Sequence, residues 1–190
     1  MGGSVAVIVG ASGGIGRTIA ERVATKERSV VLGYHRSSAV ADETAQRIRK
    51  RGGGAVALPV DIVKAAAVQE LLDGTLREYG RVDAVVHAAS APIHHARFEK
   101  DAWTAFETHW SVQVHGAFNL VQTFLPELRK AGGQVIFILS SYVLHHPPVQ
   151  MSSYVTAKYG LLGLARCLGV ELIKDGVRVN MVSPYLTPTA

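Results

Sequence analysis

A glycine-rich turn between an apolar run and a helical pattern constrains this chain more than any other feature. The run Val5-Ala-Val-Ile-Val9 leads directly into Gly10-Ala-Ser-Gly-Gly-Ile-Gly16, and a helical pattern extends from Ile15 to about Lys26. Glycines allow a tight turn and a close approach of the backbone to a ligand, and the amides at a helix N-terminus bind phosphate. The order strand, turn, helix predicts a dinucleotide-binding unit, although the turn alone also fits a connection without a ligand.

The rest of the chain alternates strands and helices, with no repeat or linker. Apolar strands separated by crossover helices predict a doubly wound, Rossmann-like α/β fold with a parallel sheet covered on both faces. Because 190 residues of 48% hydrophobic composition suffice for one core, we expect residues 1–190 to form one dinucleotide-binding and catalytic domain. The expected strands are Val5 to Val9, Ser29 to Gly33, Ala55 to Leu58, Ala84 to His87, Gln134 to Leu139 and Arg178 to Val182.

A second signal lies in Tyr154-Val-Thr-Ala-Lys158, whose four-residue spacing puts the phenol and the ammonium on one helix face. A tyrosine with a pKa near ~10 exchanges protons poorly at neutral pH unless a cation lowers that pKa, and Lys158 can supply the charge. Ser141 stands thirteen residues before Tyr154, after a buried strand, at the sheet edge where parallel sheets bind ligands. Alone, the Tyr-Lys pair is also typical of an exposed helix face.

Together these motifs resemble the short-chain dehydrogenase/reductase family, and its 3-oxoacyl carrier-protein reductases in particular, over nearly the whole chain. The family shares the Gly-x-x-x-Gly-x-Gly spacing, and Gly116–Pro126 and Gly176–Pro184 resemble its central helix and its sixth strand with the nicotinamide loop. The resemblance implies hydride transfer between a nicotinamide and a carbonyl or secondary alcohol. It makes Tyr154 the proton donor, Ser141 the group that holds the carbonyl oxygen, and Lys158 the cation that lowers the tyrosine pKa and binds the ribose.

The resemblance also implies a cofactor site. Asp61 and Ile62 resemble the adenine-pocket pair, in which the carboxylate accepts from the exocyclic amine and the apolar side chain packs on the ring. Gly33-Tyr-His-Arg-Ser-Ser38 lacks a carboxylate for the ribose and offers Arg36 and Ser37 to a 2′-phosphate, which favours NADP(H) over NAD(H) unless Arg36 points to solvent. The expected cofactor residues are Gly10, Ser12, Gly13, Gly14, Ile15, Gly16, Arg36, Ser37, Asp61, Ile62, Ala88, Ala89, Ser90, Tyr154, Lys158, Pro184 and Thr187.

Several positions depart from the family pattern. Gln113 stands where the family has an asparagine that positions the proton-relay water. His87-Ala-Ala-Ser90 replaces Asn-Asn-Ala-Gly, so we expect Ser90 and backbone carbonyls to compensate for the lost amide. Tyr185 replaces the glycine after Pro184. The chain stops at Ala190, where family members usually continue through a substrate-covering region and a seventh strand, and we expect a C-terminally shortened domain.

The composition of the chain limits the partners, the location and the metal sites that we expect. The net charge of +5 permits anionic partners, including an acidic carrier protein, but the basic residues cluster only at Arg47–Arg51, so no nucleic-acid partner is expected. The chain has no membrane-length apolar stretch and no signal-peptide start, which predicts a cytoplasmic protein. Cys167 is the only cysteine and has the setting of a packed helix residue. The eight histidines lack metal-ligand spacing, so no metal is expected, and the pairs at 94–95 and 145–146 are expected at the substrate mouth.

Two classes of function follow. The first is an NADP(H)-dependent carbonyl reductase acting on a small ketone or a 3-oxoacyl thioester, and the alternative is a non-catalytic NADP(H)-binding or assembly protein. The helical regions at about 105–130 and 152–174 are more apolar than one buried face requires, which predicts a homodimer or homotetramer unless a larger core absorbs the excess. The residues concerned are Val112, Val114, Phe118, Leu120, Val121, Phe124 and Leu125 in the first region and Leu161, Leu162, Leu164, Leu168 and Val170 in the second.

Overall fold

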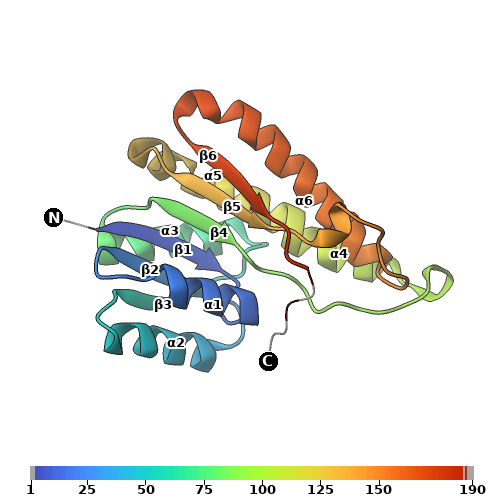
Figure 1. Ribbon diagram of the computed structural model, residues 1–190, viewed down its shortest axis with the longest axis horizontal. Helices are drawn as coiled ribbons and strands as arrows, with labels where there is room; N and C mark the ends of the chain where they lie inside the picture. The colour runs from blue at the N-terminus through green and yellow to red at the C-terminus, as the bar shows by residue number, and fades with distance from the viewer. Residues whose placement is uncertain (1–2, 186, 188–190) are drawn as a thin grey trace.

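One six-stranded parallel sheet, in the order β3-β2-β1-β4-β5-β6, forms the centre of the protein (Figure 1). The computed structural model describes residues 3–185 and 187. The predicted strands and the doubly wound fold are confirmed, with each strand boundary within one residue of its expected place. The strands are β1 (Ser4–Val9), β2 (Arg28–Tyr34), β3 (Ala55–Pro59), β4 (Ala84–His87), β5 (Gln134–Ile138) and β6 (Arg178–Val182).

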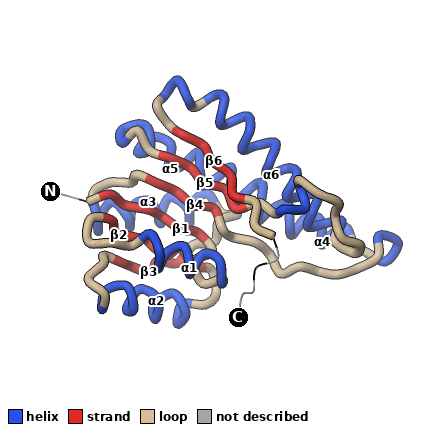
Figure 2. Tube along the Cα trace, in the orientation of Figure 1, coloured by secondary structure: helices blue, strands red, loops and turns tan. Residues whose placement is uncertain are grey.

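Helices cover both faces of the sheet and enclose two hydrophobic cores (Figure 2). The helices α1 (Gly14–Val23) and α2 (Ser38–Lys50) pack on one face. On the other face lie α3 (Ala65–Tyr79), α5 (Gly116–Ala131) and α6 (Ser152–Glu171). The strand order reverses between β1 and β4, and in open α/β sheets ligands bind at the carboxyl ends of the strands beside such a reversal.

The long central helix predicted at about 105–130 is continuous in the structure but changes its hydrogen-bonding pattern along its length. It consists of α4 (Trp103–Trp110), a π-helical segment (Ser111–His115) and α5, without a break in the helical path. A π-helical turn widens the helix and is frequent at functional sites, because it changes the direction of the side chains that it carries. Here it carries Gln113, which is fully buried.

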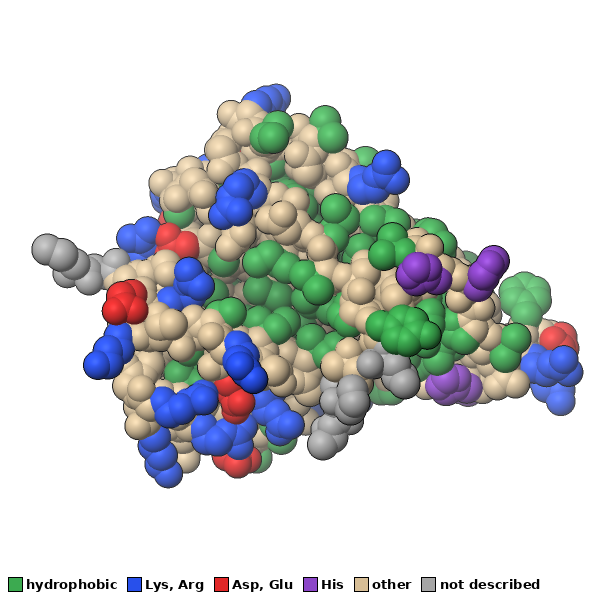
Figure 3. All heavy atoms as spheres, viewed as in Figure 1, with side chains coloured by type: hydrophobic (Ala, Val, Ile, Leu, Met, Phe, Trp, Pro, Cys, Tyr) green, Lys and Arg blue, Asp and Glu red, His purple; other side chains and the backbone are tan. Residues whose placement is uncertain are grey.

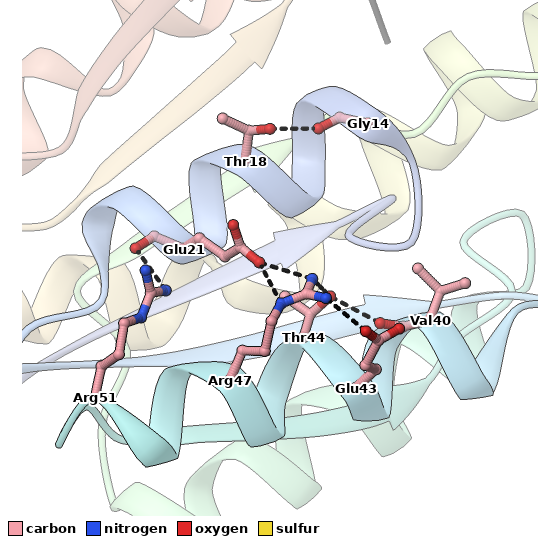
Figure 4. A network of polar contacts seen from close by, with 8 residues as sticks. All are labelled: Gly14, Thr18, Glu21, Val40, Glu43, Thr44, Arg47 and Arg51. Carbon is pink, nitrogen blue, oxygen red and sulfur yellow. Dashed lines mark hydrogen bonds and ion pairs between the residues drawn. The ribbon is translucent and has the colours of Figure 1, made fainter. Parts of the chain in front are cut away.

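The basic cluster Arg47–Arg51 lies at the end of α2 and ties this helix to α1. The guanidinium of Arg47 contacts Glu21 at 2.8 Å and Glu43 at 2.7 Å, and Arg51 donates to the Glu21 carbonyl at 3.4 Å (Figure 4). Exposed pairs of this kind contribute little to stability singly. Within the cluster, Arg47 forms the ion pairs, whereas Arg49 and Arg51 donate to backbone carbonyls.

The strand β6 forms one edge of the sheet, and most of its residues are exposed. On the face of the molecule seen in Figure 3, hydrophobic side chains are exposed over the region of β4 to β6, whereas charged side chains gather over α1 and α2. Within the described ranges, no helix is both long and apolar enough to cross a membrane.

Candidate active site

The glycine turn after β1 forms a cradle that leaves no room for side chains at two positions. Gly10 has a φ of 81°, and a Cβ added there would lie 2.6 Å from the Ala89 nitrogen, in the segment after β4. A Cβ at Gly16 would collide with the carbonyl oxygen of Gly10. Because Gly13 precedes α1 without a side-chain cap, the first amides of this helix and its positive dipole end are available to an anion.

The remaining residues of the turn contribute mainly backbone. The Gly13 amide donates to the Gly10 carbonyl at 3.1 Å, which closes the turn. Ile15, in the first turn of α1, packs its side chain against the core on the α1 side of the sheet. Ser12 is half-buried within the turn, and Gly14 is the first residue of α1.

Arg36 and Ser37 lie between β2 and α2, and both are exposed. Ser37 caps α2 without a side-chain hydrogen bond, so its hydroxyl is not committed to the helix. Arg36 takes part in none of the ion pairs found among residues 3–185 and 187. The Asp61 carboxylate lies 3.8 Å from His35 and 3.3 Å from Lys64.

Ile62 lies mostly in the core, against α5. Only 6% of its surface is exposed, and its side chain faces Gly116 on α5, where an added Cβ would lie 2.5 Å from Ile62 Cγ1. The Ile62 carbonyl accepts a hydrogen bond from Asn119 Nδ2 at 3.0 Å. Asn119 had no predicted role, although an asparagine within an apolar helix pattern could have indicated one.

The segment after β4 is held differently from the prediction. Ser90 donates its hydroxyl to the Ala91 carbonyl at 3.1 Å and so does not replace the lost asparagine amide. His87 is fully buried, and its Nε2 lies 3.2 Å from the Val112 carbonyl, which links β4 to the π-helical segment. Burial, and secondarily the charge of Lys158, lower the pKa of His87 to about 4. Ala88 donates its amide to the Val9 carbonyl at 3.0 Å, which joins this segment to β1.

Lys158 is the buried cation of the site. It is 3% exposed, and its Nζ donates to the Ile138 carbonyl at the end of β5 over 2.7 Å. The ammonium lies 5.7 Å from the centre of the Tyr154 ring, so the predicted proximity of the two side chains on one helix face is present. Burial lowers the pKa of Lys158 to about 8, which leaves the side chain largely protonated near neutral pH.

The pKa of Tyr154 is raised, not lowered as predicted, in the protein by itself. Burial of the phenol is the largest cause, and a hydrogen bond with Ser140 opposes it. Lys158 lies close but donates to a backbone carbonyl, and its charge does not outweigh the desolvation of the phenol. The apolar surroundings therefore keep Tyr154 protonated, as a proton donor requires.

Two adjacent serines, Ser140 and Ser141, lie at the end of β5, and both are almost fully buried. The prediction selected Ser141, whose amide donates to the Pro184 carbonyl at 2.8 Å. Ser140 is the serine that opposes the rise in the Tyr154 pKa, and its hydroxyl accepts from the Tyr142 amide at 3.3 Å. Both hydroxyls are thus candidates for holding a substrate oxygen.

Gln113 is buried beside a histidine that the sequence analysis had not singled out. Its Nε2 lies 3.5 Å from Nδ1 of His109, one turn earlier, and its Oε1 has no hydrogen-bond partner among the described residues. The His109 ring meets the Tyr154 ring edge-on, with centroids 5.6 Å apart at 77°. Burial, followed by the charge of Lys158, lowers the pKa of His109.

The loops around the site contribute less defined groups. Thr187 is exposed and donates its hydroxyl to the Tyr185 carbonyl at 3.0 Å. The histidines at 94–95 and 145–146 are exposed, and histidine side chains gather at one end of the molecule in Figure 3. Over the part of the chain that the structure describes, no group of at least three His, Cys, Asp or Glu side chains could hold a metal ion. Cys167 is exposed on α6, which corrects its predicted packing.

Comparison with known proteins agrees with this geometry. A family model described as short chain dehydrogenase matches residues 4–190. Tropinone reductase-like 3 of Erythroxylum coca is 30% identical over 188 residues, which cover 98% of this chain and 71% of that protein. A dehydrogenase/reductase from Sinorhizobium meliloti 1021 superposes with a TM-score of 0.92 at 30% identity, over 100% of this chain and 74% of the other. A 3-ketoacyl-(acyl-carrier-protein) reductase from Brucella melitensis, complexed with NADH, gives 0.91 at 26% identity, over 99% and 77%. The chain belongs to the short-chain dehydrogenase family of oxidoreductases.

Proposed function

We propose that the protein is an NADP(H)-dependent oxidoreductase that transfers hydride between the nicotinamide and a carbonyl or secondary alcohol. One observation carries the proposal: a protonated tyrosine and a buried lysine lie together at the carboxyl edge of the sheet, 5.7 Å apart by ammonium and ring centre. Burying an ammonium is costly, so a lysine that is 3% exposed favours a catalytic role over the non-catalytic alternative.

The residues present fit a dinucleotide. The glycine cradle and the uncapped start of α1 suit a pyrophosphate, since any side chain at Gly10 or Gly16 would fill the space. Arg36 and Ser37 are exposed where a 2′-phosphate would lie, and Asp61 suits the adenine amine. The Brucella relative was solved with NADH, so the preference for NADP(H) rests on Arg36, Ser37 and the absence of a carboxylate from Gly33–Ser38. When bound, the nicotinamide supplies or accepts the hydride.

The side chains of the site then move one proton. During reduction, Tyr154 gives its phenolic proton to the developing alkoxide, while a hydroxyl of Ser140 or Ser141 holds the substrate oxygen. The ammonium of Lys158 stabilises the resulting phenolate and binds the ribose. Solvent returns a proton to Tyr154, and in the reverse direction the phenolate accepts the alcohol proton.

The first substrate class to test is a 3-oxoacyl thioester. The name of the Brucella relative supports this class, and the net charge of +5 suits an acidic carrier protein. We assay NADPH oxidation with acetoacetyl thioesters in the wild type and in Tyr154→Phe, which keeps the ring and removes the proton donor. We expect turnover to fall by about 10²–10⁴ with NADPH affinity retained.

Tyr159→Phe is the matched control, because Tyr159 is exposed on the same helix, and its turnover should equal that of the wild type. Lys158→Ala should reduce both turnover and NADPH affinity. Full activity in Tyr154→Phe would overturn the assigned mechanism. NADPH binding without turnover of any thioester or ketone would favour the non-catalytic alternative.

We further propose that residues 1–190 act as one cytoplasmic domain that self-associates through the regions at about 105–130 and 152–174. The core absorbs part of the apolar excess, including Leu120, Phe124 and Leu161, but Phe118 remains 48% exposed and Val170 remains 78% exposed. These exposed side chains support a pairing surface. Sedimentation at micromolar concentration should show a dimer or tetramer, and an active monomer would contradict this proposal.

A further inference from the structure

His109 is one of two buried histidines at the site that the mechanism does not use, the other being His87. It is 1% exposed, and it lies on the last turn of α4, directly before the π-helical segment. Its ring touches two groups with assigned roles: Nδ1 lies 3.5 Å from the Gln113 amide nitrogen, and the ring meets the Tyr154 phenol edge-on. A single side chain therefore contacts both the proton donor and the residue expected in the proton relay.

The contact between His109 and Gln113 determines which nitrogen of His109 carries the proton. A glutamine Nε2 can only donate, so the Nδ1 atom that faces it has to accept. A neutral imidazole meets this requirement when its proton is on Nε2. Burial and the charge of Lys158 both disfavour the imidazolium, whereas Asp101 opposes them more weakly. His109 is therefore a neutral acceptor near neutral pH.

This arrangement determines what the other end of the Gln113 amide can do. With Nε2 turned to His109, Oε1 is left as a buried acceptor without a partner among the described protein groups. Buried acceptors without a donor are costly, and they mark places where a water or a ligand binds. Lys158 is near enough for its charge to act on His109, and among the described residues only one of its N–H groups has a protein acceptor, the Ile138 carbonyl.

We propose that His109 is a positioning residue that fixes the Gln113 amide and braces the Tyr154 ring. By holding Nε2, it leaves Oε1 of Gln113 as the acceptor for a water that carries protons from solvent towards Lys158. The role in turnover rests on the proposed function, whereas the orientation of the amide does not.

Two substitutions of His109 separate the effect of its hydrogen bond with Gln113 from the effect of its packing against Tyr154. His109→Phe keeps an aromatic ring against Tyr154 and loses the acceptor, whereas His109→Asn loses the ring and retains an acceptor near the Nδ1 position. We expect kcat to fall about 10-fold in His109→Phe, the size of one hydrogen bond, with NADPH affinity and KM unchanged. His109→Asn should recover most of kcat. In a Gln113→Leu background, His109→Phe should cost nothing further.

A loss in His109→Phe that persists in the Gln113→Leu background, or no recovery in His109→Asn, would overturn the positioning role. Melting temperatures of all variants identify any that lose activity by unfolding, and His109→Asn tests the proposal if His109→Phe does not fold.

A second readout does not require turnover. We assign the Gln113 side-chain NH2 by NMR from its disappearance in Gln113→Leu, and we assign the His109 tautomer from its ring ¹⁵N shifts. We expect a proton on Nε2 of His109, and Gln113 amide protons that exchange faster in His109→Phe than in the wild type or His109→Asn. A proton on Nδ1 would overturn the proposal. If the NMR expectations hold while the wild type reduces no substrate, the proposed function fails and the positioning of Gln113 stands.

Discussion

The two halves of the site are built by different means. On the side of β1 and α1, the proposed cofactor cradle is formed by backbone: Gly10 adopts a φ of 81°, and the cradle has no room for a Cβ there. Around β4, α4, β5 and α6, the proposed catalytic half consists of buried polar side chains, among them His87, His109 and Lys158. The first half is sensitive to the volume of an added side chain, and the second is sensitive to charge and to pH.

The largest difference between the halves should appear on adding one methyl group to the cradle. In Gly10→Ala, the left-handed backbone costs about 1–2 kcal/mol, and crowding against the Ala89 nitrogen at 2.6 Å adds about 1–3 kcal/mol. We expect the free energy of unfolding, measured in urea, to fall by about 2–5 kcal/mol, and NADPH binding to be lost.

Gly13→Ala is the matched control for this experiment. Its φ of −81° suits any residue, and the new Cβ would lie 3.4 Å from the Gly10 carbonyl oxygen, an ordinary contact. Its stability should match that of the wild type. Equal losses in the two variants would show that the cradle does not depend on the special geometry of Gly10.

The catalytic half should respond to acid. The pKa of His87 is about 4 in the folded protein and 6.5 in the unfolded chain, so the unfolded state binds the proton more readily. Stability is therefore fully present above pH 6.5 and falls as the pH drops through the window from 6.5 to about 4, by about 3 kcal/mol.

His87→Gln isolates this effect, because a glutamine can still donate to the Val112 carbonyl but does not titrate in this range. Urea unfolding of both proteins between pH 7 and 4 should give curves that separate as the pH falls, with the wild type losing more. Parallel curves would show that His87 is not buried in its neutral form.

The contrast between the half formed by backbone and the half formed by buried side chains explains which features could be predicted from the sequence. The strands and the glycine cradle were predictable because they depend on local patterns: apolar runs, and glycines where the backbone must turn. The spacing of Tyr154 and Lys158 likewise implied a shared helix face. The direction of the Tyr154 pKa shift was predicted wrongly, because the desolvation of the phenol depends on packing from several elements.

The roles of His87 and Ser140 were not predictable for a related reason. His87 contacts Val112, 25 residues later in the π-helical segment, and no local sequence pattern encodes a contact between such distant residues. Ser140 and Ser141 are adjacent in a strand pattern, and sequence spacing alone cannot determine which hydroxyl a short helical turn directs towards the phenol.

Arg36 allows a third comparison, because it is a side chain proposed to bind the cofactor on the half of the site that is otherwise formed by backbone. Replacing it by alanine should weaken NADPH binding by about 1.5–3 kcal/mol, the range for a hydrogen bond to a charged group, and leave NADH nearly unaffected. Binding is followed by cofactor fluorescence. Arg17→Ala, on the same side of the sheet in α1, is the control for a general loss of positive charge. Equal losses for both cofactors in Arg36→Ala would remove the argument for NADP(H).

The smallest expected effect separates the two serines. The hydrogen bond from Ser140 opposes the rise in the Tyr154 pKa, so Ser140→Ala should raise that pKa further, through the loss of an interaction worth about 1 kcal/mol. Ser141→Ala should leave the pKa of Tyr154 unchanged and lower kcat if its hydroxyl holds the substrate oxygen. The phenol is titrated by tyrosinate absorbance, with the curve of the corresponding Tyr154→Phe variant subtracted. If the Tyr154 pKa shifts in Ser141→Ala and not in Ser140→Ala, the hydroxyl bonded to Tyr154 in solution is that of Ser141, as sequence spacing predicts.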